Sequence, residues 1–400
     1  MRSLGPPVLG WKCRARWIIT SVFWRHLRIQ NLNFLLLRCR CLNEWCTLIN
    51  GRGSNSSIQG RFELLTRETF EDGWDGPADK SSTSLNTEVT EERVKSILSK
   101  NSSPDISFSH AINPYRGCEH GCSYCFARPT HSFIDLSPGL DFESRLFAKV
   151  NAAECLKSEI SKKNYVCSPI SIGASTDPYQ LIEKKYQITR SLIEVLSQAR
   201  HPFNIVTKNA LVERDIDLLS PLAERSLVKV YISITTLNNR LAHRLKPRAS
   251  APLRRLKTIK RLQKCGIPVG VMFAPVIPFL NDAELECLLS AASDSGAVSA
   301  GYLLLRLPHE VKPLFYDWLD THYPMKAEHV KARLREMRAG KDNDVQFQRR
   351  HAGQGEFATL LKQRFALACK RYSLNKGKQE LSCQLFDSDL LNGQKRLFDE

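Results

Sequence analysis

The chain has 400 residues, of which 42% are hydrophobic and 25% charged, and these proportions are typical of a soluble protein with a well-formed core. Its formal net charge of +17 suits a polyanionic partner, although a basic surface without such a partner is nearly as compatible with it. No apolar stretch reaches the roughly 18 residues that a membrane-spanning helix needs, which excludes an integral membrane protein. The thirteen cysteines are an odd count and show no secreted disulfide framework, so a cytoplasmic location is expected.

Residues 1–50 are predicted to be a basic leader of doubtful status. The first 43 residues carry eight lysines and arginines and no acidic residue. Their apolar run WIITSVFW (17–24) is too short to cross a membrane, and Arg25 follows it where a signal peptide would have small residues. A mitochondrial transit peptide stays an alternative, but the lack of a sustained helical or strand period favours a start codon assigned too far upstream.

Residues 51–104 are predicted to be a linker and N-terminal extension, with a Gly/Ser/Asn-rich start at 51–60 and one short helix near 89–99. From 105 to 307, apolar strands alternate with amphipathic helices, which predicts a parallel sheet with right-handed crossovers. Both a doubly wound sheet and a curled partial barrel satisfy this pattern. The predicted strands are 106–113, 168–173, 203–208, 228–235, 267–275 and 299–307, and the predicted helices between them are 142–163, 186–199, 214–224, 251–264 and 281–294.

The remaining C-terminal part is predicted to be a helical extension over 308–385 and a flexible tail over 386–400. The extension has expected helices at 310–321, 325–338 and 355–372.

Polar residues follow several of the predicted strands, at the edge where the chemistry of parallel α/β proteins collects. A cysteine loop follows the first strand and ASTDPYQ (174–180) the second, while Lys208 ends the third and Ser233 lies near the end of the fourth. Arg306 ends the sixth. One site at the carboxyl ends of the strands is therefore expected.

Cys118, Cys122 and Cys125 form a C-x3-C-x2-C pattern bracketed by Gly117 and Gly121. A structural zinc site usually has four ligands, and the extra ligand would have to come from His120, His131 or Cys155. A [4Fe–4S] cluster is the favoured alternative, because three thiolates can hold three irons and leave the fourth open for a substrate or cofactor. The glycines let the backbone fold around such a cluster.

This spacing, with Tyr124 just before the third cysteine, resembles the radical S-adenosylmethionine superfamily. The sequences INPYRGCEHGCSYCFAR, STDPYQLIEKKYQITR and GVMFAPVIPFLND are similar to its spore photoproduct lyase-like branch, an uncharacterised bacterial photorepair-like group in particular. The resemblance covers 105–307 and implies an α/β fold, a partial (β/α)6 TIM-like barrel with a helical C-terminal extension. It also implies a [4Fe–4S] cluster whose open iron is chelated by S-adenosyl-L-methionine, reductive cleavage of that cofactor to a 5′-deoxyadenosyl radical, and a reductant such as flavodoxin or ferredoxin.

The resemblance implies five further cofactor-binding residues. Ser175 and Ser233 would hydrogen-bond the ribose or the amino-acid end of S-adenosylmethionine, and Lys208 would neutralise its carboxylate. The alternatives are a turn serine, a serine bonded to backbone inside the barrel, and a lysine at a strand end. Asp177 is either a ligand or an Asx-turn residue, and Tyr124 would offer its backbone near the adenine.

Three arginines and one alanine complete the predicted rim. Arg116 would face the cluster or substrate, or pair with Glu119. Arg248 and Arg306 would bind an anionic substrate, although exposed arginines are common. Where spore photoproduct lyase has a cysteine that returns a hydrogen atom to the product, this chain has Ala174, and Cys167 lies farther upstream. Thymine-dimer cleavage by the same route is therefore in doubt.

The tail sequence QKRLF (394–398) resembles the peptides with which bacterial DNA enzymes bind the sliding clamp. Gln394, Leu397 and Phe398 would be its anchors, although Lys395 departs from the usual leucine and a frayed basic terminus is the alternative.

Three functional hypotheses follow. The first is a radical S-adenosylmethionine enzyme whose substrate is not identified, with DNA or RNA among the candidates. The second is a DNA repair lyase similar to spore photoproduct lyase. The third is a non-catalytic, metal-stabilised nucleic-acid-binding module.

Overall fold

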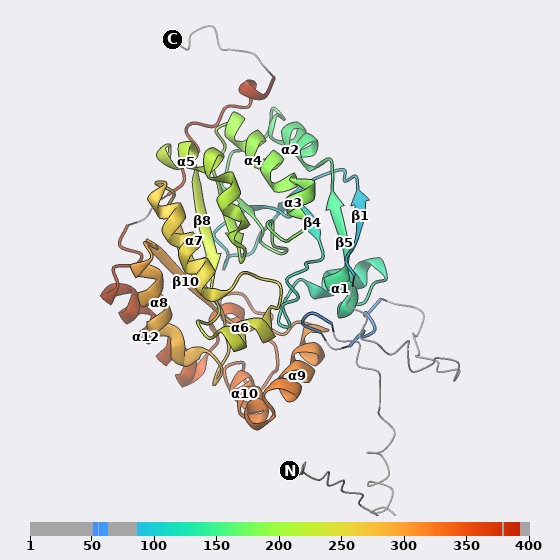
Figure 1. The fold of residues 1–400 in the computed structure, drawn as a ribbon, viewed down its shortest axis with the longest axis vertical. Coiled ribbons are helices and arrows are strands. Elements are labelled where there is room, and N and C mark those ends of the chain that lie inside the picture. Colours follow the sequence, from blue (N-terminus) through green and yellow to red (C-terminus); the bar gives the residue numbers. More distant parts are fainter. Residues whose placement is uncertain (1–50, 55, 63–85, 378–379, 393–400) are drawn as a thin grey trace, which may run out of the picture. The chain divides into compact units, whose positions relative to one another are not determined.

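A seven-stranded sheet forms the centre of the computed structural model (Figure 1), which describes residues 51–54, 56–62, 86–377 and 380–392. The strand order is β10-β9-β8-β7-β6-β3-β2. All neighbours from β3 to β10 are parallel, and β2 is antiparallel to β3. The strands are β2 (Leu98–Lys100), β3 (His110–Ile112), β6 (Ile170–Ile172), β7 (Phe203–Thr207), β8 (Val228–Ser233), β9 (Val269–Val276) and β10 (Ser299–Leu304).

The sheet does not close on itself, since β2 and β10 are its two edges in the described part of the chain. The predicted partial barrel with six parallel strands is confirmed. Alternation along the strands shows which face packs against helices: Val228, Val230 and Ile232 of β8 are buried, whereas Lys229 and Tyr231 are half-buried. The apolar set forms the core between sheet and helices.

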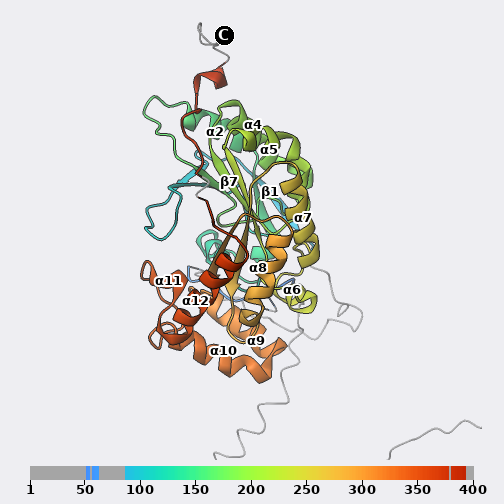
Figure 2. The same cartoon turned by 90° about the vertical axis from the view of Figure 1, so that its left-hand side faces the viewer.

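Helices follow the strands and surround the sheet (Figures 1 and 2). The longer ones, such as α4 and α7, are amphipathic, and α5, α7 and α8 pack against β8 and β9. The helices of the barrel are α1 (Leu140–Ser144), α2 (Ala152–Ile160), α3 (Glu183–Tyr186), α4 (Ile188–Gln198), α5 (Ile216–Glu224), α6 (Asn239–Leu245), α7 (Pro252–Lys264) and α8 (Leu285–Asp294), with 3-10 turns η2 (Arg128–Ile134), η3 (Ala210–Asp215) and η4 (Asp282–Glu284).

A helical extension follows β10. It contains α9 (Val311–His322), α10 (Pro324–Glu336), α11 (Arg349–Ala352) and α12 (Gly355–Arg371), and a short 3-10 turn η5 (Asp389–Asn392) ends the described chain. α12 packs on α8, and α11 packs on β10 at the open edge of the sheet. In the described part of the chain, no helix has both the length and the apolar character needed to cross a membrane.

Two helix predictions were wrong. The expected helix at 89–99 is replaced by the strands β1 (Glu88–Glu92) and β2, and the expected helix at 142–163 is interrupted by the strand β5 (Arg145–Lys149). With β4 (Tyr115–Arg116), these strands form a second sheet of order β1-β5-β4. β1 and β5 are more than fifty residues apart and are parallel, so each lacks a local partner that the sequence pattern could reveal.

Candidate functional site

The three cysteines lie in a tight loop directly after β4. Gly117 and Gly121 adopt positive φ angles of 76° and 60°, which a glycine takes without steric cost. A side chain at Gly117 would place its Cβ 2.6 Å from Leu146 Cδ2 and 3.0 Å from the Phe142 carbonyl oxygen. The Cys118 N–H donates to that same carbonyl at 2.9 Å. Gly117 thus lets the loop lie against α1 and fixes the position of Cys118.

The three thiols come together in this loop. Cys118 and Cys122 are buried and Cys125 is half-buried. Burial raises the pKa of Cys118, and the nearby Asp177, Cys122 and Cys125 raise it further. Burial likewise raises the pKa of Cys125, with Cys122 as the next cause. Within the described residues, no three or more His, Cys, Asp or Glu side chains are spaced to hold a single metal ion.

Cationic side chains surround the thiols from β7, α6 and α7. Lys246 is 1% exposed and donates to Thr235 Oγ1, and burial, followed by the charge of Arg255, holds its pKa well below the usual range. Arg255, also 1% exposed, donates to the carbonyl oxygens of Ser250 and Ser233 at 2.7 Å. Burial lowers the pKa of Lys208, but Cys122 and Asp177 more than offset this effect.

Asp177 is the buried anion of the same region. Its carboxylate accepts hydrogen bonds from Thr207 Oγ1 at 2.7 Å, from the Lys208 N–H at 2.7 Å and from the Tyr179 N–H at 3.0 Å. It also lies 3.4 Å from His120 Nδ1. Burial alone would raise the pKa of Asp177, but His120, Lys208 and Thr207 together hold it well below its usual range. Asp177 therefore makes the predicted Asx-turn contact and also ties the turn after β6 to β7.

The other predicted cofactor contacts lie on the same edge of the sheet. Ser175 is half-buried in the turn after β6, and its N–H donates to Asn113 Oδ1 at 2.8 Å. Ser233 ends β8, is buried, and its hydroxyl is 3.4 Å from the Ala274 carbonyl oxygen. The Tyr124 ring is buried, with its hydroxyl 3.4 Å from Thr235 Oγ1.

Two of the rim arginines are paired. The suggested pairing of Arg116 with Glu119 is wrong, because Arg116 lies 3.7 Å from Glu92, which ends β1 in the same three-stranded sheet. Arg248 takes that place, with Nη1 donating to Glu119 Oε1 at 3.0 Å. Arg306 lies just after β10 and is half-buried.

Ala174 lies at the carboxyl end of β6, beyond Gly173. Cys167 lies before the amino end of β6, where its Sγ is 3.7 Å from His201 Nε2. Its thiol is thus near the amino ends of the strands, whereas the predicted rim lies at their carboxyl ends.

The residues present fit a cluster-sized anionic group. The glycine loop forms a cradle that an added Cβ would fill, and the buried basic side chains Lys246 and Arg255 lie near Cys122. Ser123 Oγ, buried in the loop, has no hydrogen-bond partner among the described residues. A thiolate-ligated cluster that binds a cofactor with a carboxylate would place negative charge next to Lys246, Arg255 and the Ser123 hydroxyl.

The sequence analysis did not predict Lys246, Arg255 or Asn113 as residues of the site. Both cations lie in the stretch ISITTLNNRLAHRLKPRASAPLRRL, which reads locally as an exposed basic surface. Both are buried where Lys246 donates to Thr235 and Arg255 donates to the Ser233 carbonyl at the end of β8, and no local pattern shows these contacts.

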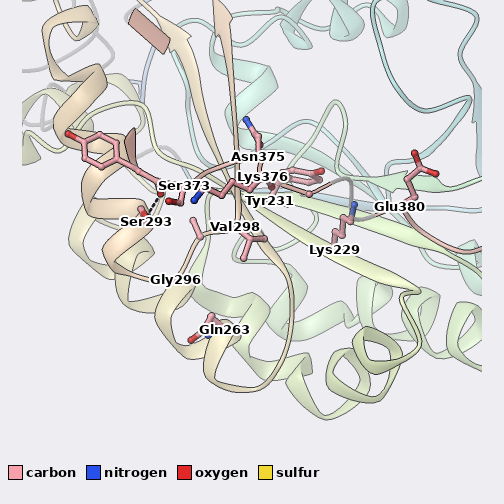
Figure 3. A pocket seen from close by; sticks show the side chains of 14 residues that line it. Lys229, Tyr231, Gln263, Ser293, Gly296, Val298, Ser373, Asn375, Lys376 and Glu380 are labelled. Atoms are coloured by element: carbon pink, nitrogen blue, oxygen red, sulfur yellow. Dashed lines mark hydrogen bonds between the residues drawn. The ribbon is translucent and has the colours of Figure 1, made fainter. Parts of the chain in front are cut away.

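Two cavities lie elsewhere. One of about 720 Å³ is lined by Lys229 and Tyr231 of β8, by Ser299 of β10, and by residues of the segment 372–377 together with Glu380 (Figure 3). Another of about 730 Å³ is lined by residues around β2 and β3, such as Lys100 and His110. None of the predicted site residues lines either cavity. The predicted clamp anchors Gln394, Leu397 and Phe398, and the leader 1–50, lie outside the described residues.

Comparisons with known proteins agree with this fold. Residues 112–292 match the model of the radical SAM superfamily. An uncharacterised protein of Mycobacterium tuberculosis is 33% identical over 221 residues, which cover 55% of this chain and 65% of that protein. An uncharacterised protein of Methanocaldococcus jannaschii is 26% identical over 200 residues, covering 50% of this chain and 73% of that protein. The matched part of this chain thus spans slightly less than two thirds of the length of the mycobacterial relative.

Among solved structures, a spore photoproduct lyase complexed with dinucleoside spore photoproduct has a similar fold, with a TM-score of 0.50 and 16% identity. The similarity covers 71% of this chain and 78% of the lyase.

Proposed function

We propose that this chain, whose residues 112–292 match the model of the radical SAM superfamily, is a radical SAM enzyme that binds a [4Fe–4S] cluster through Cys118, Cys122 and Cys125. In this proposal it reductively cleaves S-adenosylmethionine to start radical chemistry on a substrate that is still unknown. One observation carries the proposal: three thiols meet in a glycine-bracketed loop beside three basic side chains, the half-buried Lys208 and the buried Lys246 and Arg255.

Each residue near the loop has a proposed role. When bound and reduced, the cluster supplies the electron that breaks the sulfonium bond of S-adenosylmethionine. Lys208 neutralises the cofactor carboxylate, and Ser175 and Ser233 offer hydroxyls to its ribose or amino-acid end. Asp177 keeps the turn after β6 against β7, so it positions Ser175 and Lys208. Tyr124 packs its ring in the core and leaves its backbone for the adenine.

Anaerobic reconstitution tests the proposal. We expect about four irons per chain, and 5′-deoxyadenosine on addition of dithionite and S-adenosylmethionine, measured by chromatography. Replacing Cys118, Cys122 or Cys125 by Ala should remove both the iron and the product. Cys287→Ala is the matched control, since Cys287 is exposed on α8. An iron-loaded chain that never cleaves the cofactor would contradict the proposal, and bound zinc would favour the non-catalytic module instead.

Nucleic acid is the substrate class that the net charge of +17 favours. A lesion lyase is the second candidate, because a solved structure of similar fold is a spore photoproduct lyase complexed with dinucleoside spore photoproduct. Ala174 opposes this candidate, since it offers no thiol where the lyase has its hydrogen donor. Cofactor consumption measured with ultraviolet-irradiated DNA, intact DNA and RNA separates these possibilities, because only a lesion lyase should respond to irradiation.

A further inference from the structure

Four basic side chains gather at the open edge of the sheet, where β10 ends and α11 packs on it. Arg306 follows β10, Arg338 follows α10, and Arg350 and His351 belong to α11. Each of the other three lowers the pKa of His351, and Arg338 and Arg350 lower that of Arg306. Contacts place them together: Arg338 donates to the carbonyl of Leu305, next to Arg306, and Asp105 lies 2.8 Å from Arg350 and 3.7 Å from His351. We call these four side chains the arginine cluster.

Several nitrogen atoms of the arginine cluster are buried without a hydrogen-bond partner among the described residues. Arg338 is 2% exposed, and its Nη2 donates to the Leu305 carbonyl oxygen while its Nη1 has no partner. Arg306 Nε and both ring nitrogens of His351 are also without one. A buried donor that is left unpaired destabilises a fold, and more so when it is charged.

The acidic residues nearby do not balance this charge. Asp105 accepts hydrogen bonds from Arg350 Nε at 2.8 Å and Nη2 at 2.7 Å, and His351 Nε2 is 3.7 Å away from it, too far for a hydrogen bond. Burial lowers the pKa of Arg338, and the charge of Asp344 offsets part of this effect. Asp344 also lies 3.9 Å from Arg349. Asp342, two residues before Asp344, pairs with Lys312 and Arg335.

We propose that the arginine cluster is a binding site for a phosphate group, presented either by a small molecule or by a nucleic-acid strand. The unpaired donors come from three side chains on three different segments, which suits the several oxygens of a tetrahedral anion better than the two oxygens of a carboxylate. Arginine forks match phosphate geometry bidentately. The site lies at the carboxyl ends of the strands and is independent of the cysteines.

The arginine cluster differs from ordinary surface basic residues of the same extension. Arg364 on α12 donates to both oxygens of Glu286, at 2.8 and 2.6 Å, so its fork is already occupied. It is therefore a matched control for Arg306, whose Nε is unpaired.

Thermal unfolding of the full chain with inorganic phosphate tests the site. At matched ionic strength, phosphate should raise the midpoint of wild-type unfolding more than chloride does, because a ligand that binds only the folded state stabilises it. Arg306→Gln should weaken phosphate binding about tenfold or more, whereas Arg364→Gln should leave it unchanged. Arg306→Gln is preferred to Arg338→Gln because Arg338 also holds the Leu305 carbonyl.

A second arm identifies the source of the phosphate. A single-stranded DNA of about ten nucleotides without terminal phosphates should bind the wild type more tightly than Arg306→Gln if the site takes a strand. If only inorganic phosphate distinguishes the two proteins, the site takes a small phosphorylated molecule. The proposal is overturned if phosphate protects no better than chloride and the DNA binds both proteins equally.

Discussion

At the scale of single residues, the cysteine loop depends on glycines whose backbone no other residue can adopt without strain. Gly117 combines a φ of 76° with a close approach to Leu146 and to the Phe142 carbonyl. Since Cys118 donates to that carbonyl, the glycine and the first thiol are positioned by one contact. The conformation of the loop therefore depends on the backbone of Gly117 and Cys118 as well as on the thiols that it carries.

Gly117→Ala is expected to cut the iron content of the reconstituted chain to less than half. The added Cβ would lie 2.6 Å from Leu146 Cδ2, so the loop must shift and carry Cys118 away from the other thiols. Iron per chain after anaerobic reconstitution measures the effect, with circular dichroism to show that the protein still folds.

Gly266→Ala is the matched control for this test. Gly266 also has a positive φ of 75°, but an added Cβ would meet nothing within 4 Å. It should cost only the roughly 1 kcal/mol of a left-handed non-glycine residue and leave the iron content unchanged. Equal iron in both variants would mean that Gly117 does not position the thiols.

At the scale of secondary-structure elements, a buried ion pair joins the cysteine loop, η2 and α1. Arg128 pairs with Glu143, and both are 0% exposed. Arg128 also donates to the carbonyl oxygens of Cys122 at 2.9 Å and Gly139 at 2.8 Å. These short elements have little stability of their own, so this single side chain holds them together.

Arg128→Met is expected to lower the free energy of unfolding by about 3–5 kcal/mol, because it leaves the Glu143 carboxylate buried without its partner. Urea unfolding measures the loss. Arg93→Met is the matched control: its pair with Glu154 is 70% and 73% exposed, and removing it should change the stability by less than about 1 kcal/mol. Similar losses in the two variants would rule out the buried pair as a major stabilising contact.

The same scale explains what the sequence could predict. Six strands and the main helices were predictable because each carries its own period of apolar residues, as α4 and α7 do. β1 and β5 were not, since their pairing joins segments far apart in the chain. The cysteines, Asp177 and Lys208 could be found from spacing and strand ends, whereas Lys246 and the arginine cluster depend on packing between distant elements.

At the scale of the whole molecule, two buried histidines and one half-buried histidine make the fold sensitive to acid. Burial is the largest cause that lowers the pKa of His131, His201 and His351, each to about 4. An unfolded histidine titrates near 6.5. Between pH 6.5 and 4 the unfolded chain therefore binds more protons than the folded one, and the free energy of unfolding falls as the pH falls through this window. Above pH 7 these histidines contribute no pH dependence.

His201 gives the sharpest test of this acid sensitivity. Its side chain is 0% exposed, with Nδ1 2.9 Å from the Pro202 carbonyl oxygen and Nε2 2.8 Å from the Tyr165 hydroxyl. These contacts make Nδ1 the donor and Nε2 the acceptor of a neutral ring. For pKa values of 6.5 and about 4, His201 alone should account for roughly 2 kcal/mol of the stability lost between pH 7.5 and 5.

His201→Gln should therefore reduce the difference between the free energies of unfolding at pH 7.5 and pH 5 by about that amount, whatever its effect on stability at pH 7.5. Urea titrations at the two pH values give this difference directly. His243→Gln, at an exposed position on α6, should keep the wild-type difference because its ring is solvated in both states. A His201→Gln protein with the full wild-type difference would show that the buried ring takes up its proton without unfolding, and that the acid sensitivity of the fold arises elsewhere.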